Sequence, residues 1–99
     1  MSERGTGFKK IHDLREKIDA IDDQLLWLVS RRVRLAIEVG LVKKHSGLAA
    51  RSSVREKQIL RRLVEANPGP LPHSAVRRIF HQVVQESRRA AIRVRYGRD

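Results

Sequence analysis

The sequence predicts an all-α protein built from three helices, of which the first is very long. Residues 11–44 contain no proline and a single glycine, Gly40. Their apolar residues recur at alternating steps of three and four, the spacing that places side chains on one face of a helix. Two later stretches repeat this periodicity between stop signals, and no stretch alternates apolar and polar residues as a strand does. The apolar series of the first stretch is Ile11, Leu14, Ile18, Ile21, Leu25, Leu28, Leu35, Val39 and Val42.

The first helix is too long for a chain of this size to cover. A helix over residues 11–44 would span roughly 50 Å, and the rest of a 99-residue chain offers too little surface to bury it. Because the apolar seam runs along its whole length, we expect a second copy to pack against it as a homodimer. We expect the helix to begin near Ile11, with Asp13 and Glu16 in a capping-box-like arrangement and residues 1–10 as a flexible N-terminus.

Stop and start signals delimit the two shorter helices. A glycine-containing stop at 45–47 ends the first helix, and residues 48–52 form a loop. Residues 53–56 match a capping box that opens the second helix, with Glu56 as its acceptor, and residues 67–70 end that helix.

The third helix begins between Pro72 and Ala75, and its apolar stripe continues through Ser87 to Ala91. We therefore place the helical domain at 11–91 and a basic C-terminal tail at 92–99.

The composition narrows the classes of function. The chain has no cysteine, so disulfides and thiolate metal sites are excluded. It shows no leader with an apolar core and no membrane-spanning run, which predicts a cytoplasmic protein that does not bind membranes. The formal net charge of +11 favours anionic ligands, but the basic residues are scattered over every helical segment. Of the four aromatic residues, only Tyr96 lies near the C-terminal basic run. We expect a solvated basic surface and no nucleic-acid partner.

A charged residue interrupts the seam of the first helix. Arg32 occupies the seam position between Leu28 and Leu35, where burial is costly unless an anion meets the guanidinium. Ala36, Gly40 and Lys43 follow on the same face, so two cations bracket two small residues. This pattern predicts a basic slot with a low floor. The small residues are equally explained by a close helix crossing, and both interpretations can hold.

Other polar residues extend the candidate site. Arg15 lies seventeen residues before Arg32, about 25 Å along the axis, so it cannot serve the same pocket in the same chain. In an intertwined dimer it could reach the slot of the partner; otherwise it is a solvated arginine. Ser87 interrupts the stripe of the third helix, although serine often bonds back to its own helix. The four histidines show no metal-ligand spacing.

Arginine meets a carboxylate through two parallel hydrogen bonds, and lysine offers a movable point charge. Together these residues suit a small dicarboxylate that carries hydroxyl or ether oxygens. No pair of a nucleophile and a base stands out.

Three segments resemble the all-helical, AroQ-type (type II) chorismate mutases over roughly residues 11–91. They read LREKIDAIDDQLLWLVSRRVRLAIEVGLVKK, VREKQILRRL and GPLPHSAVRRIFHQVVQESRRA. The resemblance implies an intertwined homodimer with two active sites. It also implies rearrangement of chorismate to prephenate, an intramolecular [3,3] shift in aromatic amino acid or related biosynthesis that needs no cofactor and no metal.

The resemblance also implies roles for single residues. Lys43, Arg32 and Glu56 would be catalytic. Arg15 would enter from the partner chain, Arg32 would hold a carboxylate, and Arg55 would be a further basic residue of the pocket. Lys43 would donate to the ether oxygen. Glu56 would accept from the ring hydroxyl, and Ser87 would lie against the ring carboxylate.

Two positions depart from the family pattern. Ala91 stands where relatives usually carry glutamine or glutamate as a second donor to the ether oxygen, and Ser52 stands where they often carry aspartate. The substrate therefore stays open between chorismate and 4-amino-4-deoxychorismate. An isochorismate pyruvate lyase ranks lower, because such relatives tend to lack the Arg55–Glu56 pair. A weakly active binding homologue that depends on a shikimate-pathway enzyme as its partner is a further alternative.

Overall fold

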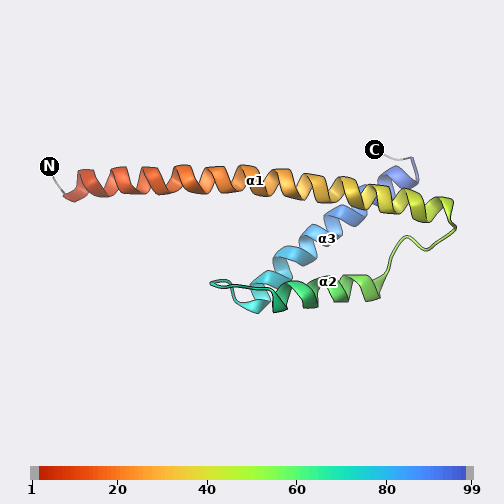
Figure 1. Ribbon diagram of the computed structural model, residues 1–99. Coiled ribbons are helices and arrows are strands. Elements are labelled where there is room, and N and C mark those ends of the chain that lie inside the picture. Colours follow the sequence, from red (N-terminus) through yellow and green to blue (C-terminus); the bar gives the residue numbers. More distant parts are fainter. Residues whose placement is uncertain (1–2, 98–99) are drawn as a thin grey trace. The chain divides into compact units, whose positions relative to one another are not determined.

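The computed structural model describes residues 3–97 and contains three helices (Figure 1). Helix α1 covers Glu3–His45, α2 covers Ser53–Glu65 and α3 covers His73–Arg95. No strand occurs within the described range. The predicted all-α fold, with one long N-terminal helix followed by two shorter ones, is confirmed.

Two helix ends differ from the prediction. Helix α1 starts at Glu3 rather than near Ile11, because residues 3–10 contain no proline and the helical hydrogen bonds continue through them. The predicted cap at Asp13 is therefore wrong, and Glu16 instead pairs with His12 at 3.2 Å on the helix surface. Helix α3 continues to Arg95, so the first part of the segment assigned as a tail is helical. Residues 98–99 of that segment lie outside the described range.

The cap of α2 also lies one residue earlier than predicted. The hydroxyl of Ser52 accepts a hydrogen bond from the backbone N–H of Arg55 at 3.2 Å, which makes Ser52 the N-cap. The predicted capping box that starts at Ser53 is thus wrong. A serine at either position satisfies the same local pattern, and the path of the preceding loop selects the first one. The side chain of Glu56 is consequently available for another partner.

The chain divides into two units, residues 1–31 and 32–99. Within the first unit, α1 carries an apolar face that no residue of its own unit covers. Six of its side chains are each 46–54% exposed: Ile11, Leu14, Ile18, Ile21, Leu25 and Leu28.

The second unit holds the C-terminal part of α1 together with α2 and α3, and α2 packs along α3 (Figure 1). Its core is small. Ile59 of α2 and Val76 and Val84 of α3 are buried, and Ser87 is the most buried polar residue within 3–97, at 3% exposure. The predicted stripes of α2 and α3 thus face each other.

Helix α1 and helix α3 approach closely at Gly40. Gly40 is buried, and a Cβ atom added to it would lie 3.3 Å from the Cβ of Ala91. The close crossing proposed for the small residues of α1 is therefore present at Gly40. Among the described residues, no helix is long and apolar enough to cross a membrane.

Candidate active site

The second unit has an open cavity of about 310 Å³ between the C-terminal part of α1, the loop before α2, α2 itself and α3. This volume lies at the lower end of the range of small-molecule pockets, roughly 300–1,000 Å³. Aliphatic side chains form part of its wall, including Val39, Ile59 and Val84. The polar part of the wall consists of Arg32, Lys43, Arg51, Ser52, Arg55, Glu56, Ser87 and Arg88.

The structure brings most of the predicted site residues to this one cavity. Seven of the eight line it, from three helices and one loop: Arg32, Lys43, Ser52, Arg55, Glu56, Ser87 and Ala91. Ala36 and Gly40 line it as well, so the small residues of α1 form a floor and a helix crossing at once. Arg15 belongs to the other unit, is exposed, and is not among the lining residues.

Arg32 and Ser87 are joined across the helix crossing. An Nη atom of Arg32 donates to the Oγ of Ser87 at 2.6 Å, and that hydroxyl donates in turn to the carbonyl oxygen of Val83 at 2.8 Å. Ser87 therefore bonds back to its own helix and faces the cavity as well. Its single proton is already engaged, which matters for the ligand contacts that it can make.

The electrostatic environment of Arg32 favours the binding of an anion beside it. Burial lowers the pKa of Arg32, and the positive charges of Arg55 and Arg62 lower that pKa further. An arginine stays protonated throughout the physiological range even so. The lowered pKa thus reflects a partly buried cation that also lies near other cations, and a carboxylate bound beside it would offset both effects.

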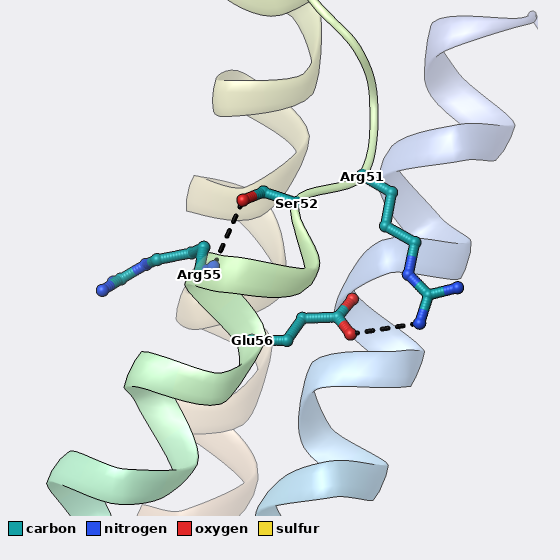
Figure 2. A network of polar contacts seen from close by, with 4 residues as sticks. All are labelled: Arg51, Ser52, Arg55 and Glu56. Carbon is teal, nitrogen blue, oxygen red and sulfur yellow. Dashed lines mark hydrogen bonds and ion pairs between the residues drawn. The ribbon is translucent and has the colours of Figure 1, made fainter.

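The start of α2 presents its polar side chains in two directions (Figure 2). Ser52 caps the helix through the backbone of Arg55, and the side chain of Arg55 leaves the first turn on one side. The carboxylate of Glu56 leaves on the other side and accepts from Arg51 at 3.3 Å. Because the N-terminus of a helix carries a partial positive charge, this end of α2 adds to the attraction for an anion.

The sequence did not identify two cations of the cavity wall, Arg51 and Arg88. Arg51 lies in the loop before α2, and sequence alone did not show that this loop lines the cavity. Arg88 had a detectable signal. It lies four residues after Val84 and three before Ala91, so it is a charge on the apolar stripe of α3, as Arg32 is on α1.

The charges of the lining residues do not balance. Five cations, Arg32, Lys43, Arg51, Arg55 and Arg88, face one carboxylate, that of Glu56, which leaves a formal surplus of four positive charges. A small ligand with two carboxylates fits this surplus. In the part of the chain that the structure describes, no group of histidines and carboxylates could hold a metal ion.

Comparisons with known proteins point to one family. The sequence model of chorismate mutase type II matches residues 14–91. The chain is 37% identical over 76 residues to a bifunctional chorismate mutase/prephenate dehydratase of Stutzerimonas stutzeri, covering 72% of this chain and 21% of that protein. The corresponding protein of Escherichia coli (strain K12) is 37% identical over 75 residues, covering 75% of this chain and 19% of that protein. The chain thus spans about a fifth of the length of these relatives.

The fold agrees with the sequence comparison. A structure of chorismate mutase (form II) from Thermus thermophilus superposes with a TM-score of 0.77 at 33% identity, covering 79% of this chain and 89% of that one. Form I of the same enzyme gives a TM-score of 0.78 at 33% identity, covering 79% of this chain and 98% of that one.

Proposed function

This chain belongs to the chorismate mutase type II family, and on that premise we propose that it rearranges chorismate to prephenate in the cavity flanked by Arg32 and Lys43. One observation carries the proposal. Four more cations than carboxylates converge on a cavity of small-molecule size, from three helices and a loop. Chorismate brings two carboxylates to that surplus.

The reaction needs positioning more than acid–base chemistry. The ether C–O bond breaks while a C–C bond forms within the same molecule, and no proton is transferred to the protein. Arg32 and Arg55 bind the two carboxylates and hold the enolpyruvyl arm over the ring, so the reacting carbons start close together. Support comes from the position of both arginines in the cavity wall.

Lys43 supplies the electrostatic part of the rate enhancement. Negative charge builds up on the ether oxygen as the C–O bond lengthens, and the ammonium donates to that oxygen. Within the described chain, no hydrogen bond or ion pair engages the side chain of Lys43, so its donors are available to a ligand. Removing one such preorganised donor typically costs on the order of 10²–10³ in rate.

Glu56 recognises the substituent on the ring. Its carboxylate is oriented by Arg51 at 3.3 Å and accepts a hydrogen bond from the ring hydroxyl. Since a carboxylate accepts equally well from an amine, 4-amino-4-deoxychorismate is the second candidate substrate. Ser52 favours neither, because a hydroxyl can donate to or accept from either substituent while its oxygen also accepts from the backbone of Arg55.

We also propose that the enzyme works as an intertwined homodimer, with Arg15 of the partner subunit completing each site. The exposed apolar face of residues 11–28 supports this arrangement, because its six aliphatic side chains are about half exposed in the single chain. Such a face is typical of an interface between subunits.

The test is a substrate panel of chorismate, isochorismate and 4-amino-4-deoxychorismate, each incubated with purified protein and followed by product identification. We expect prephenate from chorismate and no pyruvate release from isochorismate. A Lys43→Ala protein purified in parallel controls for contaminating mutase of the expression host. Absence of rearrangement with all three substrates would overturn the proposal, and turnover of the amino compound alone would favour the second candidate.

A further inference from the structure

Arg88 belongs to the wall of the cavity, although no family resemblance pointed to it. Val84, Arg88 and Ala91 follow one another at steps of four and three along α3, and all three line the cavity. Arg88 is half-buried, and in the described chain its Nε–H is buried without a hydrogen-bond partner. A buried donor without an acceptor destabilises the ligand-free protein.

Neither Arg89 nor Arg95, two other arginines of α3, combines a place in the cavity wall with an unpaired guanidinium. Arg89 is exposed and pairs with Glu86 at 2.6 Å, and it does not line the cavity. Arg95 also has a buried Nη without a partner, but its other Nη donates to the carbonyl oxygen of Leu48 at 3.0 Å, away from the cavity. Arg88 combines a cavity position with a guanidinium that makes no hydrogen bond or ion pair in the described chain.

The third helix has no other side chain with a donor to spare at the cavity. The proton of the Ser87 hydroxyl goes to Val83, and the same oxygen accepts from Arg32. Ala91 carries no donor at all. A ligand carboxylate that approaches α3 would therefore meet the guanidinium of Arg88, whose two Nη groups can bind a carboxylate through two parallel hydrogen bonds.

We propose that Arg88 is a further substrate-binding residue, which donates through its Nη groups to a carboxylate of the substrate from the α3 side of the cavity. The inference rests on the proposed function, since it takes the ligand to be the same dicarboxylate. It assigns the ligand contact on α3 to Arg88, while Ser87 holds Arg32 in place. Each of the three helices then contributes at least one cation that contacts the substrate: Arg32 and Lys43 from α1, Arg55 from α2 and Arg88 from α3.

The experiment compares Arg88→Met, Arg88→Lys and the control Arg89→Met, which removes the same charge one residue away. We expect Arg88→Met to raise KM for chorismate about 10–100-fold, equivalent to about 1.4–2.8 kcal/mol, with kcat within about threefold. Arg88→Lys keeps the charge but loses the paired donors, so its KM lies in between. Arg89→Met stays within about twofold of the parent.

A second readout separates binding from a structural role. Without ligand, Arg88→Met should melt at or above the Tm of the parent, because the unpaired buried donor is gone. With prephenate as the probe ligand, the parent and Arg89→Met should gain Tm and Arg88→Met should gain far less.

The outcomes are distinguishable. An active parent whose KM and prephenate-induced Tm gain are unchanged by Arg88→Met overturns the role of Arg88 and leaves the proposed function standing. A lower Tm of ligand-free Arg88→Met, with KM unchanged, assigns Arg88 to structure instead. A parent that neither turns over chorismate nor gains Tm from prephenate overturns the proposed function, and the inference falls with it.

Discussion

Lys43 is the residue on which the proposed chemistry depends most directly. It lies eleven residues after Arg32 on the same face of α1, roughly 16 Å along the axis, and closes the other end of the floor formed by Ala36 and Gly40. We expect Lys43→Ala to lower kcat for chorismate by at least about 10²–10³, since it removes the donor to the ether oxygen. Steady-state kinetics measures the loss, and circular dichroism should show an unchanged helix content.

Lys44→Ala is the matched control for that variant. Lys44 follows directly in α1 but donates to the backbone carbonyl of Arg95 at 2.7 Å and does not line the cavity. Its removal should change kcat less than about twofold, as is usual for an exposed polar contact. Normal turnover by Lys43→Ala would contradict the mechanism.

Ala91 is the position where the cavity lacks a donor that relatives usually supply. Its Cβ lies at the close crossing with Gly40, and Ala91 also lines the cavity. We expect Ala91→Gln to raise kcat for chorismate, because the amide adds a second donor to the ether oxygen. Arg89→Gln, on the exposed side of α3, controls for the substitution itself. A fall in kcat for Ala91→Gln would mean that this site is built differently from those of its relatives.

The second helix depends on a cap that brings Arg55 and Glu56 to the cavity. Ser52 is that cap, and Ser53 is the first helical residue. We expect Ser52→Ala to lower the free energy of unfolding by about 0.5–2 kcal/mol. Ser53→Ala should change it much less, because within the described chain its hydroxyl makes no hydrogen bond. Denaturant titrations at equal protein concentration measure both changes. A larger loss of unfolding free energy for Ser53→Ala than for Ser52→Ala would assign the cap to Ser53 instead.

At the scale of the whole molecule, the proposed dimer makes each active site a shared one. Arg15→Ala and Lys43→Ala should each be nearly inactive alone. When the two are refolded together, the mixed dimer has one site with Lys43 from one chain and Arg15 from the other. Because half of the dimers are mixed and each has one intact site, activity should recover to about one quarter of the parent. A mixture no more active than its components would show that each site is built from a single chain.

Periodicity alone determined the three helices, because the hydrogen bonds of a helix are local and its buried face repeats every three or four residues. It also indicated Arg32, Lys43 and Ser87, because a polar residue on an apolar stripe marks a cavity or an anion. The family resemblance instead supplied the site roles of Ser52, Arg55, Glu56 and Ala91. Applied to α3, the same argument would have found Arg88.

Only the tertiary structure decided what depends on contacts between segments distant in sequence. The crossing at Gly40 and Ala91 brings Arg32 to Ser87, fifty-five residues away, and so fixes where the proton of that serine goes. The path of the loop selected Ser52 as the cap and turned Arg51 toward Glu56. Neither choice has a local signature: the adjacent Ser52 and Ser53 satisfy the same capping rule, and the partner of Arg51 depends on the path of the loop.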